Sequence, residues 1–161
     1  MLRLVQRRVV KPVMDLLRMG ATPERLAWSI AAGLLIGINP VLGSTTVLAL
    51  AVASAFRLNY VASQLGNHLM YPLELLLFPV WIALGSRLFG TPGLKLGRHE
   101  LMLEVKHHPW QTTKALWTWE WHALVVWAFA AAILMPLLAM VLKPVLDKML
   151  DRLHHEPVIE K

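Results

Sequence analysis

Hydrophobic residues fill most of the chain between residues 26 and 88, and this run is broken near its middle. The stretch GLLIGINPVLGSTT (33–46) leads from an apolar, helix-like segment into Asn39-Pro40, turns near Gly43 and continues as TTVLALAVASAF. Each apolar half, 26–38 and 44–56, is shorter than the about 20 helical residues needed to cross a hydrocarbon core. The pattern therefore predicts two short helices that fold back on each other as a re-entrant hairpin.

Small residues recur every four positions on both sides of this break. Such rows allow helices to approach closely in lipid. They predict close helix packing and are formed by Ser29, Gly33 and Gly37 before the break, and by Ala49 with Ala53 and Ala51 with Ala55 after it.

Two further apolar segments follow. Residues 60–88 contain Pro72 and Pro79, so we expect an interrupted segment that either crosses the membrane or forms a second re-entrant hairpin. Residues 121–142 contain no Asp, Glu, Lys or Arg and predict a membrane-spanning helix, kinked at Pro136. Tryptophans crowd the start of this span, as in an interfacial aromatic belt; they are Trp110, Trp117, Trp119 and Trp121.

Both ends of the chain have amphipathic patterns. Residues 2–18 combine an apolar stripe with Arg3, Arg7, Arg8 and Lys11, which predicts a basic helix lying on an anionic membrane surface. Residues after Pro144 have a second stripe, which faces either the interface or a partner. Between the first helix and the hairpin, Thr22-Pro23-Glu24 has the composition of a helix start.

These patterns predict an all-α, polytopic integral membrane protein with one or two broken, re-entrant hairpins and amphipathic terminal helices. We expect a basic cytoplasmic N-terminus, whereas the side of the C-terminus depends on whether residues 60–88 cross or re-enter. The predicted parts are an N-terminal helix (1–19), a membrane domain with broken helices (20–90), an amphipathic connecting loop (91–119), a transmembrane helix (120–143) and a C-terminal helix (144–161).

Composition supports the membrane assignment. The chain is 57% hydrophobic and only 16% charged, beyond the usual balance of a soluble domain. The first residues lack a cleavage pattern after their apolar region, so we expect a retained flank. The net charge of +6 comes from residues that flank apolar segments, which favours anionic lipid head groups over nucleic acid as partners. Small-residue helix faces predict a homo-oligomer.

Glu74 is the most unusual residue of the apolar region. A carboxylate inside an apolar segment is costly and marks a candidate site for proton or cation coupling, or for head-group discrimination. Its expected structural role is an ion pair with Arg57 or Arg87. His68 precedes it by less than two helical turns and is either a second site residue or a packing residue. Three asparagines could bind a phosphate or tie the helix breaks together: Asn39, Asn59 and Asn67.

Other chemistry has weaker support. Glu104 and His107 form one Glu-x-x-His spacing, with Glu100 and His108 nearby, but metal-binding bundles use that motif twice with further carboxylates. A solvated face is therefore preferred, and no metal or other cofactor is predicted. The chain has no cysteine, Ser-His-Asp set or phosphate loop, so we expect no enzymatic activity.

The order of motifs over residues 20–90 resembles the bacterial membrane proteins grouped as domain of unknown function 2062. Their pattern appears here as Thr22-Pro23-Glu24, Ala31-Gly33-Gly37, Pro40 with Gly43, Arg57 with Asn59, and Pro72. Two positions depart from it, because Tyr71 stands where an asparagine usually precedes the second proline, and Glu74 where a small polar residue is usual. The resemblance implies a small inner-membrane protein and no particular reaction.

Two hypotheses follow. The first is a multi-pass inner-membrane protein that transports or flips a lipid or lipid-linked phosphate; the alternative is a non-transporting scaffold or assembly factor. The candidate ligand-binding residues are Asn39, Pro40, Gly43, Arg57, Asn59, Asn67, His68, Pro72 and Glu74.

Overall fold

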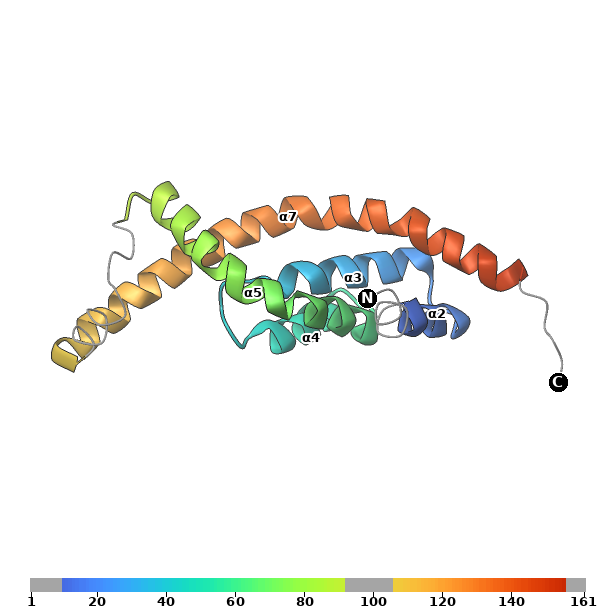
Figure 1. Cartoon of the computed structure of the whole chain (residues 1–161), viewed down its shortest axis with the longest axis horizontal. Helices are drawn as coiled ribbons and strands as arrows, with labels where there is room; N and C mark the ends of the chain where they lie inside the picture. The colour runs from blue at the N-terminus through green and yellow to red at the C-terminus, as the bar shows by residue number, and fades with distance from the viewer. Residues whose placement is uncertain (1–9, 92–105, 156–161) are drawn as a thin grey trace.

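The computed structural model describes residues 10–91 and 106–155, and within these it contains five α-helices and no strand (Figure 1). The all-α prediction is confirmed. The basic residues before Val10 and the acidic half of the Glu-x-x-His stretch, Glu100 and Glu104, lie outside the described residues. The helices are α2 (Lys11–Arg18), α3 (Pro23–Ile36), α4 (Thr45–Ala55), α5 (Tyr60–Leu88) and α7 (Pro109–His155).

The start of α3 follows the predicted capping pattern. The Thr22 Oγ1 accepts a hydrogen bond from the Arg25 N–H at 3.3 Å, Pro23 takes the first helical position and Glu24 lies in the first turn. Each of these residues suits the positive, donor-rich end of a helix.

The break falls where the sequence predicts it. Helix α3 ends at Ile36, the chain turns through Gly43 in the left-handed region (φ 81°), and α4 begins at Thr45. Helix α4 then runs back beside α3 and α5 and forms the second arm of the hairpin (Figure 1). At about 21 Å and 17 Å, each helix is too short to cross a hydrocarbon core of about 30 Å alone.

Helix α5 differs from the prediction, because it continues through Pro72 and Pro79 without a break. Helix α7 also differs: it starts within the expected 91–119 loop and passes through Pro136 and Pro144 into the expected separate C-terminal helix. Proline has a φ that fits a helix, and neighbouring groups in a membrane helix can compensate for its missing N–H. A proline in an apolar segment is therefore a weaker breaker than we assumed.

Helix α3 forms the centre of the molecule. It lies between α7 and the α4–α5 pair in Figure 1, and nine of its residues are buried, including Leu26, Ala31 and Ile36. Its most extensive contacts are with α5 and α7. Helix α3 is thus packed between the two long helices, α5 and α7.

The two amphipathic ends pack against each other. Val13, Leu16 and Leu17 on α2 are buried in one cluster with Leu26 of α3 and Leu146 of α7. The described part of the stripe expected on the membrane surface is therefore covered by protein in α2, while residues 2–9 of that stripe lie outside the described residues. The partner of the C-terminal stripe is the chain's own N-terminal helix.

Helices α5 and α7 are long and apolar enough to cross a membrane. Their 29 and 47 residues correspond to about 44 Å and 70 Å of helix. Only 22% of the most apolar window of α5 and 11% of that of α7 are buried inside the molecule. Apolar surface left exposed on such a scale is typical of contact with lipid.

Candidate functional site

The backbones of α3 and α5 touch at three glycines. A Cβ on Gly33 would overlap the carbonyl oxygen of Ser63, one on Gly37 would meet the Asn67 carbonyl oxygen at 2.7 Å, and one on Gly66 would meet the Ile30 carbonyl oxygen at 2.6 Å. Only glycine, which has no Cβ, permits this approach. The predicted small-residue row on α3 therefore has its partner on α5.

Asn39 shapes the turn that follows α3. Its side-chain Oδ1 accepts a hydrogen bond from the Val41 N–H at 2.7 Å, closing a local turn around the buried Pro40. Ser44, at the other end of the turn, donates its hydroxyl to the Val41 carbonyl at 2.8 Å.

Two tryptophans bind the carboxyl end of α3. The Trp127 indole N–H donates to the Leu35 carbonyl at 2.9 Å, and the Trp81 indole N–H donates to the Ile38 carbonyl at 2.7 Å. These donors, from α7 and α5, compensate for the main-chain donors that carbonyls lack at a helix end. Our sequence reasoning missed both residues. The only available signal was that a tryptophan N–H at membrane depth needs an acceptor.

Three buried side chains, one in the turn after α3 and two on α5, carry polar atoms that have no hydrogen-bond partner among the described residues. Asn39 and Asn67 have no exposed surface and Glu74 has 9%, yet the Asn39 Nδ2, Asn67 Oδ1 and Glu74 Oε1 atoms make no hydrogen bond. An unsatisfied buried polar atom costs about 1–3 kcal/mol. We call Asn39, Asn67 and Glu74 the buried polar cluster.

The register of α5 places Glu74 opposite the end of α3. Gly37 contacts Asn67 and Met70, while Ile38 accepts the hydrogen bond from Trp81. Glu74 lies between these contact points on the same helix and is itself buried. Glu74 therefore lies near the middle of α5, in the part of that helix that faces the break between α3 and α4.

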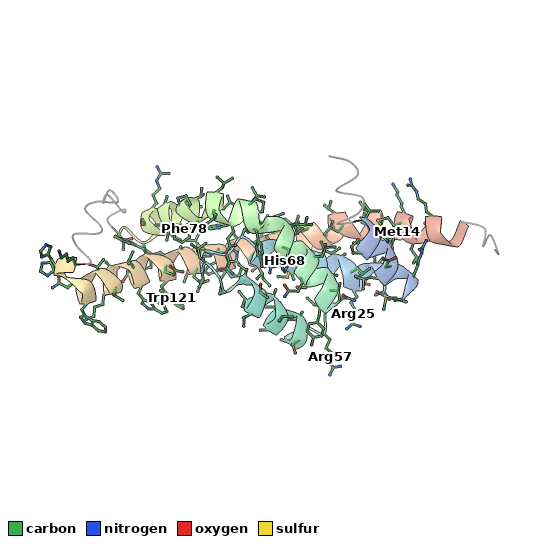
Figure 2. All side chains as sticks on the ribbon, turned by 60° about the horizontal axis from the view of Figure 1, so that its bottom comes forward. Met14, Arg25, Arg57, His68, Phe78 and Trp121 are labelled. Carbon is green, nitrogen blue, oxygen red and sulfur yellow. The ribbon has the colours of Figure 1, made fainter. Side chains whose placement is uncertain are left out.

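The expected ion pairs of Glu74 do not form. Arg87 lies thirteen positions after Glu74, or about 20 Å along a continuous helix. Arg57 precedes the start of α5 at a similar separation, and Figure 2 shows its side chain at the free end of α4, pointing away from the helices. The pairing prediction assumed a break at Pro72 that the structure does not have.

Arg57 instead ends α4. It has φ 53°, and the Leu58 N–H beside it donates to the Ala53 carbonyl at 2.8 Å. This is the left-handed position that commonly follows a helix and that glycine usually takes. Its exposed guanidinium lies at the same end of the molecule as Arg25 (Figure 2).

The remaining candidates have local structural roles. The Asn59 Oδ1 caps α5 by accepting from the Ala62 N–H at 2.9 Å, and the Asn59 N–H donates to the Ser29 hydroxyl at 2.8 Å. His68 is exposed, contacts the Gln64 carbonyl through Nδ1 at 2.7 Å and lies against the Tyr71 ring. Pro72 and Gly43 are exposed. Three of the nine predicted residues, Asn39, Asn67 and Glu74, thus carry buried polar atoms without a partner among the described residues, and Pro40, next to Asn39 in the chain, is also buried.

Tyr71, which departs from the resemblance pattern, joins two helices. Its hydroxyl lies 3.1 Å from the Thr46 hydroxyl, linking α5 to the first turn of α4. The Gln64 side-chain amide also donates to the Thr46 carbonyl at 3.1 Å. The amino end of α4 is therefore held against α5.

Comparison with known families identifies the group to which this fold belongs. The family described as an uncharacterized protein conserved in bacteria, domain of unknown function 2062, matches residues 6–155. The chain belongs to this family. The match extends beyond the resemblance over residues 20–90 and includes the tryptophan-rich helix α7. No curated protein and no solved structure matches the chain.

Proposed function

We propose that this family member is a multi-pass inner-membrane protein that transports or flips a lipid or lipid-linked phosphate. The carrying observation is the buried polar cluster at the end of α3, halfway along a helix long enough to cross the membrane. Three unsatisfied polar groups at this depth destabilise a purely structural protein, whereas a polar substrate or ion would satisfy them.

The proposed orientation makes α5 and α7 the two crossings, with α3 and α4 as a hairpin that enters and leaves from one side. Helix α2 packs beside Leu146 of α7, so α2 and the later part of α7 lie at the same end of the described structure. That end also carries Arg25 and Lys143, and basic residues of this kind favour the cytoplasmic side.

The two helix ends at the break favour ligands of opposite charge. The carboxyl end of α3 is electronegative and packs at Gly37 against Asn67 of α5, the helix that also carries Glu74, which suits a proton or cation. The amino end of α4 is electropositive, and Ser44 gives it no side-chain cap. That end, with the Asn39 Nδ2, suits the phosphate oxygens of a substrate. Glu74 would therefore carry the coupling ion, and the exposed Arg57 would take no part in binding.

A transport assay with a matched carboxylate variant tests this proposal. Liposomes containing the purified protein and a fluorescent prenyl phosphate are treated with a membrane-impermeant quencher, with and without a proton gradient. We expect the gradient to accelerate quenching, and Glu74→Gln to abolish that acceleration while Glu120→Gln on α7 retains it. Transport by Glu74→Gln that still responds to the gradient would remove the coupling role.

The second candidate is a non-transporting scaffold or assembly factor, and one observation favours it. The glycine contacts between α3 and α5 are so close that they leave no space for a ligand at Gly33 or Gly37. A cysteine at Ser44, in a chain without cysteine, distinguishes the two candidates by its reaction with an impermeant maleimide. Labelling indicates a water-filled path to the break. Protection from both sides, with a cysteine at Lys148 as the accessible control, favours the scaffold.

We also propose that the protein is a homo-oligomer. Helix α4 presents Val47 and Leu50 outward, with 71% and 43% of their surfaces exposed, next to small residues such as Ala51 and Ser54. Such a face permits a second copy to pack closely. Disulfide cross-linking through a cysteine at Ala51 should give dimers in membranes, whereas a cysteine at Phe129 on α7 serves as the control.

A further inference from the structure

A groove lies between the first turns of α3 and the later part of α7. It has a volume of about 210 Å³ and is lined by Glu24, Ala27 and Trp28 from α3 and by Ala139, Met140 and Lys143 from α7. Neither the buried polar cluster nor the break contributes to it. Whole-ligand pockets typically measure about 300–1,000 Å³, so this groove fits a polar group rather than a complete lipid.

The groove lies where the apolar part of α7 ends. Residues 121–142 carry no formal charge, and Lys143 is the first charged residue after them. Glu24 lies in the first turn of α3, just before the uncharged stretch that begins at Leu26. Charged residues at both of these limits place the groove at the depth of lipid head groups.

Two opposite charges face this groove without pairing. Glu24 and Lys143 are both exposed and both line it, yet within the described residues no ion pair joins them. The Trp28 indole, with 37% of its surface exposed, forms part of the same wall. A ligand with one positive and one negative group would satisfy the two charges and place its cation near an aromatic ring.

We propose that this groove binds the head group of an aminophospholipid of the phosphatidylethanolamine type. The Lys143 ammonium binds the lipid phosphate, and the Glu24 carboxylate accepts hydrogen bonds from the lipid ammonium. The acyl chains extend along the exposed apolar side of α7 beside Met140, where Leu137 and Val141 are also exposed. This lipid is a resident of the groove and is distinct from any transported substrate, so the inference does not depend on the proposed function.

Native mass spectrometry of the full-length protein in detergent tests the inference. The protein is mixed with phosphatidylethanolamine, with phosphatidylglycerol, or with an N-acylated phosphatidylethanolamine that keeps the phosphate but has no ammonium charge. We expect the wild-type protein to retain phosphatidylethanolamine in preference to the other two. Glu24→Gln should reduce this retention about five-fold, the effect of about 1 kcal/mol for a partly exposed charge pair, without reducing that of phosphatidylglycerol.

Lys143→Gln should weaken retention of every phospholipid, because each carries the phosphate. The matched controls are Asp15→Asn on α2 and Lys148→Gln on α7, exposed residues that do not line the groove. Equal retention of the three lipids by the wild-type protein would overturn the inference without any variant having to fold. Unchanged head-group preference in Glu24→Gln would overturn it as well.

Discussion

The indole N–H of Trp127 donates to the main-chain carbonyl of Leu35, a residue 92 positions earlier, across 2.9 Å. This bond fixes the carboxyl end of the short helix α3 to the long helix α7. With the bond from Trp81 to Ile38, it stabilises a helix end that lies inside the molecule, where water cannot satisfy the carbonyls.

Replacing Trp127 with phenylalanine should therefore destabilise the fold. The ring is retained but the donor is lost, and because Leu35 also accepts from the Ile38 N–H at 3.3 Å, we expect a cost of about 1 kcal/mol. Thermal unfolding in detergent, followed by circular dichroism, measures this. Trp121→Phe, at a residue with 55% of its surface exposed, is the control and should leave the midpoint unchanged.

Gly33→Ala should have a larger effect. Its methyl group would overlap the Ser63 carbonyl on α5, which is main chain and cannot move without displacing the helix. Overpacking of this kind costs about 1–3 kcal/mol, and we expect the upper part of that range. The same unfolding measurement, with Ala128→Val on the exposed side of α7 as the control, tests it. An unchanged midpoint would mean that α3 and α5 are less closely packed than described.

Arg57→Gly should stabilise the protein. The left-handed conformation costs a non-glycine residue about 1–2 kcal/mol, whereas glycine adds about 0.4–1 kcal/mol of unfolded-chain entropy, so a gain between about 0 and about 1.6 kcal/mol remains. Arg57→Ala is the matched control, because it removes the guanidinium but keeps the strain. Loss of transport in both variants would show that the charge takes part in function.

Two asparagines should respond in opposite ways. Asn67→Leu removes an unsatisfied buried oxygen together with one long hydrogen bond, from the Asn67 Nδ2 to the Gln64 Oε1 at 3.3 Å, so the unfolding midpoint should change little. Lipid phosphate transport should fall about tenfold if the cluster binds the coupling ion or substrate. Asn59→Ala removes the cap of α5 and should cost about 1 kcal/mol while transport continues. Equal losses of stability in both variants would give Asn67 a structural role.

The sequence predicted the hairpin because its signals are local. Proline, glycine and the small-residue row fix where α3 ends and which side packs closely. The predicted interruption at Pro72 is wrong because the cost of a proline in a helix depends on neighbouring groups, which only the folded structure supplies. The contact between α2 and α7 could not be predicted for a related reason, since Leu16 facing lipid and Leu16 facing α7 give the same sequence pattern. The indole bonds join residues far apart in sequence and leave no periodic signal.

The length of α7 has a mechanical consequence. At about 70 Å, one uninterrupted helix extends more than twice the thickness of the hydrocarbon core, from the tryptophan-rich turns after Pro109 to the segment that packs on α2. In the orientation proposed above, α7 would therefore connect both membrane surfaces as a single helix. With that orientation, a tilt imposed at its tryptophan-bearing end would reach Leu146 and the groove at Lys143 through one continuous helix, without any loop.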